Sequence, residues 1–219
     1  MALVALSGLC WAIVYVEAIR VGLRDRTYAI PVFALALNLA WEGLYAIHGL
    51  FLTPGAGAFM RMHTAINVVW VAFDVAILVT FFRFGGNAWP QLGRSLLYLM
   101  GVLALIVGVS VQLAFNLEFG PRDGGTYAAF AQNLLMSVLF VDMLLRRGGP
   151  RGQSMVIAVA KLVGTLAPTI SLGFLSGFNP YVAVLGLLCL LFDVIYVLAL
   201  WSVRDAAGVT ASPREGQRR

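Results

Sequence analysis

The chain has 219 residues, of which 61% are hydrophobic and only 11% are charged, and its formal net charge is +5. Soluble domains contain about 25% charged residues, so this composition excludes an ordinary soluble protein and indicates an integral membrane protein. The positive charge does not point to nucleic acid, because the arginines fall between apolar runs, where they set the orientation of a membrane protein.

Apolar runs separated by clusters of Arg, Gly and Pro are long enough to cross a bilayer as helices. There are seven, at approximately 2–19, 27–51, 64–82, 95–119, 127–145, 154–175 and 181–202. The sequence therefore predicts an all-α fold, a compact bundle of seven transmembrane helices joined by short loops. We expect one domain over residues 1–204, followed by a disordered polar tail at 205–219.

The arginines are distributed unevenly between the two sides of this predicted bundle. Twelve of the fourteen lie in the first, third and fifth loops or in the C-terminal tail, whereas the other side holds only Arg61 and Arg122. Positive residues are retained on the cytoplasmic side of membranes. We therefore expect a multi-pass protein of the plasma membrane with its N-terminus outside and its C-terminus in the cytoplasm.

The second predicted span, 27–51, carries an ionisable carboxyl group near its middle, that of Glu42. A carboxylate at the centre of a bilayer costs about 2.5–3.5 kcal/mol, so its presence indicates a functional site. At 100° per residue, Asn38, Trp41 and Tyr45 share one helical face with it. The span thus presents an amide, an indole, a carboxyl group and a phenol together.

Other spans also carry polar and aromatic side chains at helical spacing. They are Asn67, Trp70 and Asp74 in the third span, Gln112, Phe115 and Asn116 in the fourth, Gln132 and Asn133 in the fifth, and Asp193 and Tyr196 in the seventh. Polar groups in hydrocarbon must pair with one another or line a cavity, so we expect these faces to converge. Helical rise places Glu42, Asp74 and Asp193 about 15–18 Å from the outer surface, which predicts a mid-membrane pocket.

Several of these residues also have simpler interpretations. The amides of the fourth and fifth spans could hold helices together, and Asp74 could either complete a carboxyl triad or hold Trp70 in place. Asp142 is spaced to pair with Arg146 one turn later, and Lys161 could extend its amine toward the cytoplasmic side. Neither the two histidines nor the two cysteines have metal-ligand spacing, so we predict no metal site and no cofactor.

A carboxyl group in an apolar pocket without a cation can act as a stored proton, because burial penalises its anion. Aromatic rings around it can stabilise a carbocation by cation–π attraction, worth up to about 2 kcal/mol each when desolvated. This combination suits protonation of an alkene or epoxide in a lipid-like substrate, followed by cyclisation of the cation. A second carboxyl group could orient the acid, relay its proton or take up the final proton.

Residues of the second and seventh spans match the motifs of a known family. They are Asn38, Trp41, Glu42, Tyr45, Asp193 and Tyr196. This pattern resembles the small seven-span membrane-bound terpene cyclases of the paspaline and pyripyropene type, which include bacterial indole-sesquiterpenoid cyclases of the drimentine type. The resemblance implies a proton-initiated, metal-free cyclisation in which Glu42 and Asp193 are the essential acidic pair.

The resemblance also implies that residues 1–204 form a catalytic domain of isomerase or lyase type. Its substrate would be prenylated, for example a farnesylated indole, and its product a polycyclic indole sesquiterpenoid or meroterpenoid of secondary metabolism. Besides substrate and lipid bilayer, no cofactor, nucleic acid or obligate protein partner is expected. The residues expected to bind substrate are Asn38, Trp41, Tyr45, Asn67, Trp70, Asp74, Gln112, Phe115, Asn116 and Tyr196.

A small seven-span transporter that uses an intramembrane carboxylate pair is the alternative interpretation. Pro90 and Gln91 are similar to the dipeptide of some small seven-span carriers, but no second copy exists, as a transporter built of parallel repeats would require. The chain also has no two adjacent aspartates. It therefore lacks the Asp-rich magnesium motif of ionisation-type terpene synthases and the Asp-x-Asp-Asp motif of soluble proton-initiated cyclases.

Overall fold

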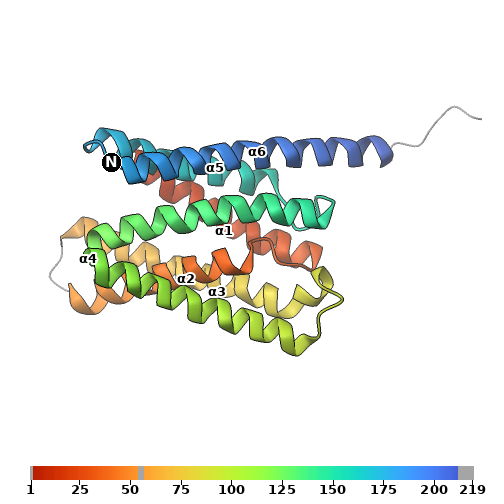
Figure 1. Cartoon of the computed structure of the whole chain (residues 1–219), viewed down its shortest axis with the longest axis horizontal. Helices are drawn as coiled ribbons and strands as arrows, with labels where there is room; N and C mark the ends of the chain where they lie inside the picture. Colours follow the sequence, from red (N-terminus) through yellow and green to blue (C-terminus); the bar gives the residue numbers. More distant parts are fainter. Residues whose placement is uncertain (1, 54–56, 212–219) are drawn as a thin grey trace, which may run out of the picture.

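The computed structural model describes residues 2–53 and 57–211, and within them the chain is helical without strands. The long helices run antiparallel along one axis (Figure 1). They are α1 (Ala2–Asp25), α2 (Val32–Ile47), α3 (Ala58–Ala88), α4 (Arg94–Arg147), α5 (Met155–Ile170) and α6 (Pro180–Ala211). Single π-helical turns, η1 (His48–Leu52) and η2 (Ser171–Leu175), extend α2 and α5. This confirms the all-α class.

In the described part of the chain, six helices are long and apolar enough to cross a membrane, and α4, with 54 residues, is far longer than a single crossing needs. The backbone of α4 leaves helical geometry at Gly120, where φ is 74° and ψ is 171°, directly before Pro121. Figure 1 shows that the chain reverses there, so the two halves of α4 lie side by side in opposite directions. These halves correspond to the separately predicted spans 95–119 and 127–145.

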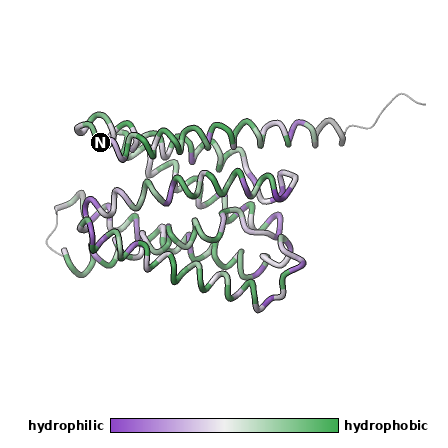
Figure 2. Tube along the Cα trace, in the orientation of Figure 1, coloured by the Kyte–Doolittle hydropathy of each residue, from purple (hydrophilic) through white to green (hydrophobic). Residues whose placement is uncertain are grey.

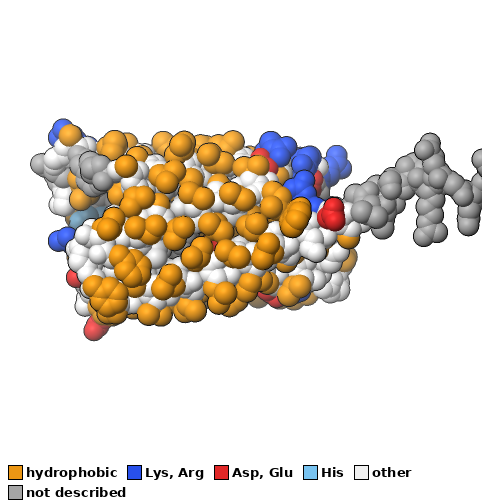
Figure 3. Space-filling view, turned by 90° about the horizontal axis from the view of Figure 1, so that it is seen from above, with side chains coloured by type: hydrophobic (Ala, Val, Ile, Leu, Met, Phe, Trp, Pro, Cys, Tyr) orange, Lys and Arg blue, Asp and Glu red, His pale blue; other side chains and the backbone are white. Residues whose placement is uncertain are grey.

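The helices pack around α2, which contacts α3 and α4. Residues of α2 also belong to the apolar core of the bundle. On the other side, α1 packs against α5 and α3, and α6 packs against α4 and α5 (Figure 1). Apolar residues dominate the helices along most of their length, as Figure 2 shows. The face of the bundle drawn in Figure 3 is likewise largely apolar, as expected of helices that face lipid.

Arginines connect the ends of α1, α4 and α5 at one end of the bundle. The Arg147 guanidinium lies 4.6 Å from the centroid of the Tyr28 ring and donates to the Tyr28 carbonyl at 2.9 Å. Arg151 donates through Nε to the Asp25 carbonyl at 3.1 Å. Figure 3 shows Lys and Arg side chains gathered at the end from which α6 continues. The first and fifth loops therefore lie at the same end, as predicted.

Two expectations about this end of the bundle can be compared with the structure. Asp142 and Arg146 form the predicted ion pair one turn apart on α4, which confirms that prediction. The prediction of a disordered tail from residue 205 does not fit the first residues of that tail, because α6 remains helical to Ala211. Residues 212–219 of that tail lie outside the described residues.

Close approach of α2 and α4 depends on the absence of a side chain at Gly108. A Cβ atom there would lie 2.6 Å from the Ala36 carbonyl oxygen, whereas a Cβ atom at Gly43 would meet nothing within 4 Å. Both glycines lie inside helices, so alanine improves helix propensity equally, by about 1 kcal/mol. We expect Gly108→Ala to lower the stability of the protein by about 1–3 kcal/mol through overpacking, and Gly43→Ala to leave it unchanged or slightly raised.

Thermal unfolding of the two purified variants in the same detergent measures this difference. Equal midpoints for Gly108→Ala and Gly43→Ala would show that α2 and α4 are less tightly packed than the structure indicates.

Candidate active site

Glu42 lies on α2 with only 1% of its surface exposed, and it is held by neighbours on two helices. Tyr15 of α1 donates its hydroxyl to Glu42 Oε1 at 2.5 Å. Asn38, one turn earlier on α2, donates its Nδ2 amide to the same oxygen at 2.9 Å. These donors orient the carboxyl group and would stabilise its anion, since hydrogen bonds to an ionised acceptor are the stronger kind.

Asp74 of α3 is completely buried beside Glu42. The Asn38 Nδ2 amide also donates to Asp74 Oδ2 at 2.9 Å, so one amide bridges the two carboxyl groups. The other oxygens, Glu42 Oε2 and Asp74 Oδ1, are buried and receive no N–H or O–H donor within the described chain. Because both accept from the same amide, the two carboxyl groups are close neighbours. A bond between them requires that one carries a proton, because two carboxylates are both acceptors.

Amides from both halves of α4 fix the orientation of Asn38. Gln132 Nε2 donates to Asn38 Oδ1 at 3.1 Å, and Gln112 Nε2 donates to Gln132 Oε1 at 2.6 Å and to the Leu37 carbonyl at 3.2 Å. This places the Asn38 carbonyl toward α4 and its NH₂ group toward the carboxyl pair. Gln112, which the sequence predicts to bind substrate, connects the two halves of α4 and α2 in the structure, as its simpler interpretation expects.

The aromatic residues predicted for the site pack in pairs. Trp41 packs against Tyr45, with ring centroids 4.8 Å apart, and donates its Nε1 to the Gly125 carbonyl at 2.9 Å. Asn116 donates to the Tyr45 hydroxyl at 3.5 Å. Trp70 meets the Tyr15 ring edge-on, with centroids 5.7 Å apart. Aromatic rings of α1, α2 and α3 thus lie near the carboxyl pair, and their role in substrate binding stays a prediction.

Three other predicted residues lie at the margins of this arrangement or away from it. Asn67 is buried, its Nδ2 is 3.5 Å from His63 Nδ1, and its Oδ1 has no partner among the described residues. Phe115 packs on Phe119 at 5.9 Å between centroids. Tyr196 donates its hydroxyl to Gln153 and packs against a phenylalanine of α4, so the prediction that it lines the site beside Glu42 is not supported by its contacts.

Asp193 differs most from its predicted surroundings. The Lys161 ammonium of α5 donates to its two carboxyl oxygens at 2.7 and 3.0 Å and to the Ser137 hydroxyl at 2.6 Å. Lys161 and Asp193 are each only 1% exposed. The prediction that Lys161 extends to the cytoplasmic surface is therefore wrong. The carboxyl group beside Glu42 is that of Asp74, and not Asp193 as the sequence motif implied.

The prediction that Asp193 lies beside Glu42 failed because the sequence does not show which face each helix turns toward its neighbours. Depth along a span follows from counting residues, but the rotation of α5 and α6 does not. A buried ammonium needs a counter-ion, and removing either member of such a pair leaves an uncompensated charge. Lys161 and Asp193 satisfy each other. Among the described residues, no group of three or more His, Cys, Asp or Glu side chains could hold a metal ion.

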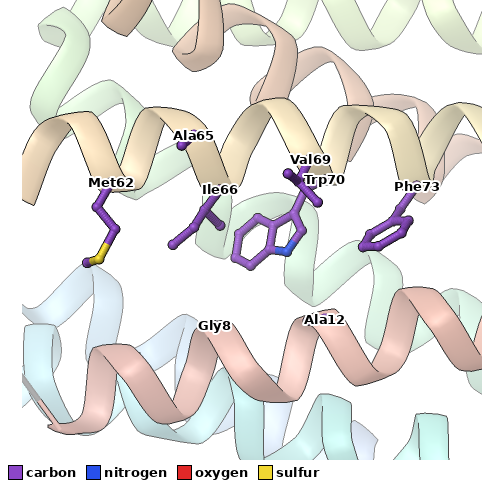
Figure 4. A pocket seen from close by; sticks show the side chains of 8 residues that line it. All are labelled: Gly8, Ala12, Met62, Ala65, Ile66, Val69, Trp70 and Phe73. Carbon is purple, nitrogen blue, oxygen red and sulfur yellow. The ribbon is translucent and has the colours of Figure 1, made fainter.

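A groove of about 360 Å³ lies between α1 and α3, as Figure 4 shows. Its lining is apolar and consists of Gly8, Ala12, Met62, Ala65, Ile66, Val69, Trp70 and Phe73. Sequence reasoning missed this groove, and it also missed Tyr15, which packs against Trp70 and Phe73 and bonds to Glu42. A tyrosine inside the mostly apolar first span was the available signal, because a buried hydroxyl needs a polar partner.

The sequence matches a family of known proteins and several characterised relatives. Residues 1–206 match the Pyr4-like transmembrane terpene cyclases. The chain is 28% identical to terpene cyclase pyr4 of Aspergillus fumigatus, over 90% of this chain and 84% of that protein. It is 29% identical to terpene cyclase nodB of Hypoxylon pulicicidum, over 72% of this chain and 63% of the relative.

A third relative, asnovolin H synthase nvfL of Aspergillus novofumigatus, is 29% identical over 74% of this chain and 64% of its own length. No solved structure gives a significant match. Because the family match extends over nearly all of the helical bundle and its buried carboxyl groups, the chain belongs to the Pyr4-like transmembrane terpene cyclases, membrane enzymes that cyclise terpenoids.

Proposed function

We propose that this enzyme starts cyclisation by transferring the proton held between Glu42 and Asp74 to an alkene or epoxide of a prenylated substrate. The observation that carries the proposal is the Asn38 amide, which bridges two buried carboxyl groups at 2.9 Å each. None of the ion pairs between described residues involves either group. The pair can therefore hold a proton in a dry site without a metal ion.

The reaction balances without any other reactant. The proton forms a C–H bond with the terminal alkene, or an O–H bond with the epoxide, and leaves a carbocation that the next alkene attacks to close a ring. Loss of a proton from the last cation to the carboxylate pair restores the acid, so the product is an isomer of the substrate. Between these steps, hydrogen bonds from Tyr15 and Asn38 stabilise the carboxylate.

Aromatic rings near the pair can stabilise the cationic intermediates. Trp70 and Tyr15 lie on α3 and α1, and Trp41 and Tyr45 flank Glu42 on α2. The negative faces of such rings attract a carbocation by up to about 2 kcal/mol each when water is excluded. A farnesylated indole is the substrate that we propose, on the basis of the resemblance to indole-sesquiterpenoid cyclases.

In this mechanism Asp193 does not supply the initiating proton. Its carboxylate neutralises Lys161, and Lys161 also holds Ser137 on the same half of α4 that carries Gln132. The ion pair thereby joins α5, α6 and α4 behind the amides that orient Asn38. We propose Asp193 as a positioning residue.

We also propose a membrane topology for the enzyme. The two halves of α4 would each cross the bilayer, which gives seven crossings, and the arginine-rich end would face the cytoplasm with the N-terminus outside. Residues 1–204 would then form the catalytic domain, embedded in the plasma membrane. Prenylated substrate and lipid are the only partners that the proposed reaction needs.

Glu42→Gln and Asp74→Asn each remove the shared proton while keeping the shape of the side chain. We expect each variant to lose at least about 100-fold in turnover, the usual contribution of a general acid. Membranes that contain the protein are given a farnesylated indole, or its epoxide, in the presence of a metal chelator, and mass spectrometry measures formation of an isomer of unchanged mass.

Asp142→Asn is the matched control, because Asp142 pairs with Arg146 at the surface of α4. Its turnover should equal that of the parent enzyme. Full turnover by folded Glu42→Gln and Asp74→Asn would refute the acid pair, and proton-coupled accumulation of a solute in vesicles without conversion would favour the transporter interpretation.

A double-variant cycle tests the role of Asp193. Asp193→Leu alone leaves the Lys161 ammonium buried without a counter-ion, so we expect a loss of about 3–5 kcal/mol in stability together with loss of activity. In Lys161→Met/Asp193→Leu no charge remains, and we expect stability and most of the turnover to return. Thermal unfolding and product formation are measured on the same detergent preparations. A stable double variant without activity would instead identify Asp193 as a proton donor or acceptor.

A further inference from the structure

We infer that the groove between α1 and α3 binds the isoprenoid chain of the cyclase substrate and admits it sideways from the lipid. This inference rests on the proposed function, since it assigns a place to the substrate of the Glu42–Asp74 pair. It is carried by the shape of the groove, its apolar lining and its position beside Tyr15.

The groove exists because α1 presents small residues where α3 presents large ones. Gly8 and Ala12 face Met62, Ile66 and Trp70 across it, and Figure 4 shows the α3 side chains pointing toward the α1 ribbon. A Cβ atom at Gly8 would meet no other atom within 4 Å. The space at this position is therefore open and is not filled by a neighbouring helix.

The lining selects for an apolar chain. It contains no charged residue, and the indole N–H of Trp70 is its only polar side-chain group. The groove runs along α3 from Met62 to Phe73, about 16 Å at the helical rise per residue, which accommodates an extended short isoprenoid. Met62 and Val69 are 54% and 52% exposed on the outer face of the bundle, so the groove opens toward lipid.

At its inner end, the groove is connected to Glu42 by Tyr15, which contacts two residues of the lining. The Trp70 and Phe73 rings lie 5.7 and 6.2 Å from the Tyr15 ring, centroid to centroid, and the Tyr15 hydroxyl bonds to Glu42. Glu42 and Asp74 are themselves 1% and 0% exposed, so no substrate reaches them without a movement of these rings. A chain lying in the groove has its end next to the three rings that separate it from the proton.

This continuity favours the substrate over other apolar occupants. A phospholipid acyl chain or a second copy of the protein would fit an apolar surface anywhere on the bundle, and neither has a reason to end at an aromatic group bonded to a catalytic acid. The isoprenoid must come near Glu42, and the groove is the apolar hollow whose inner wall contacts the Glu42 partner, Tyr15.

Gly8→Leu tests the inference, because the open space at Gly8 allows the new side chain to fill the groove without unfolding the helix. We expect kcat/KM for a farnesylated indole to fall about tenfold or more, mainly through a higher KM, since substrate binding is what the leucine obstructs. A shorter geranylated analogue should be affected less. Ala72→Leu is the matched control, because Ala72 is exposed on α3 but does not line the groove.

Photolabelling gives a second measurement that does not depend on turnover. A farnesylated indole with a diazirine near the end of its chain should label peptides of α1 or α3 that line the groove, and unlabelled substrate should compete. Glu42→Gln should still be labelled, and Gly8→Leu should be labelled far less. Loss of turnover in Glu42→Gln together with unchanged kinetics in Gly8→Leu would overturn the groove while leaving the acid pair intact.

Other occupants of the groove would be recognised in the same experiment. Labelling of the same peptides by a diazirine phospholipid that excess substrate does not displace would assign the groove to lipid and refute the inference. Cross-linked dimers formed through a cysteine introduced at Gly8 would assign it to a second copy. Full turnover in Glu42→Gln would overturn the proposed function itself, independently of the labelling.

Discussion

The Asn38 amide, which donates to two carboxyl groups at once, is the interaction on which the rest of this site depends. Carboxyl groups are costly in hydrocarbon, and two of them side by side repel each other unless a proton is shared. Asn38 can bridge them only because Gln132 and Gln112 fix the opposite end of its amide. These hydrogen bonds hold α2, α3 and both halves of α4 in one fixed arrangement. In the proposed mechanism, the hydrogen bonds that position the acid are also the ones that join these helices.

The bundle contains two different solutions to the burial of carboxyl groups. Among the described residues, Glu42 and Asp74 have amide and phenol donors but no ion pair, an arrangement suited to storing a proton. Asp193 pairs with the ammonium of Lys161, which also bonds to Ser137, and these contacts join three helices. The contrast separates a group suited to giving up a proton from one suited to holding structure, although both lie in apolar spans. A buried acid acquires its role from its partners and not from its depth.

Access to a sealed acid is the remaining physical requirement of the fold. Glu42 and Asp74 are almost completely buried, which protects a carbocation from water but also excludes the substrate. Small residues on α1 leave a groove whose aromatic inner wall contacts the Tyr15 partner of Glu42. The groove that we propose for the isoprenoid would let the enzyme take its substrate directly from the lipid.

The amino-acid sequence by itself determined the helical membrane bundle and pointed to Glu42 on α2 as a candidate site, because apolar length and a costly carboxyl group are local properties. It also predicted the ion pair of Asp142 and Arg146, which needs only helical spacing. The partner of Glu42 and the destination of Lys161 were decided by tertiary structure alone. Helix rotation decides which faces of α3, α5 and α6 meet. That rotation depends on packing contacts between residues that are far apart in the chain.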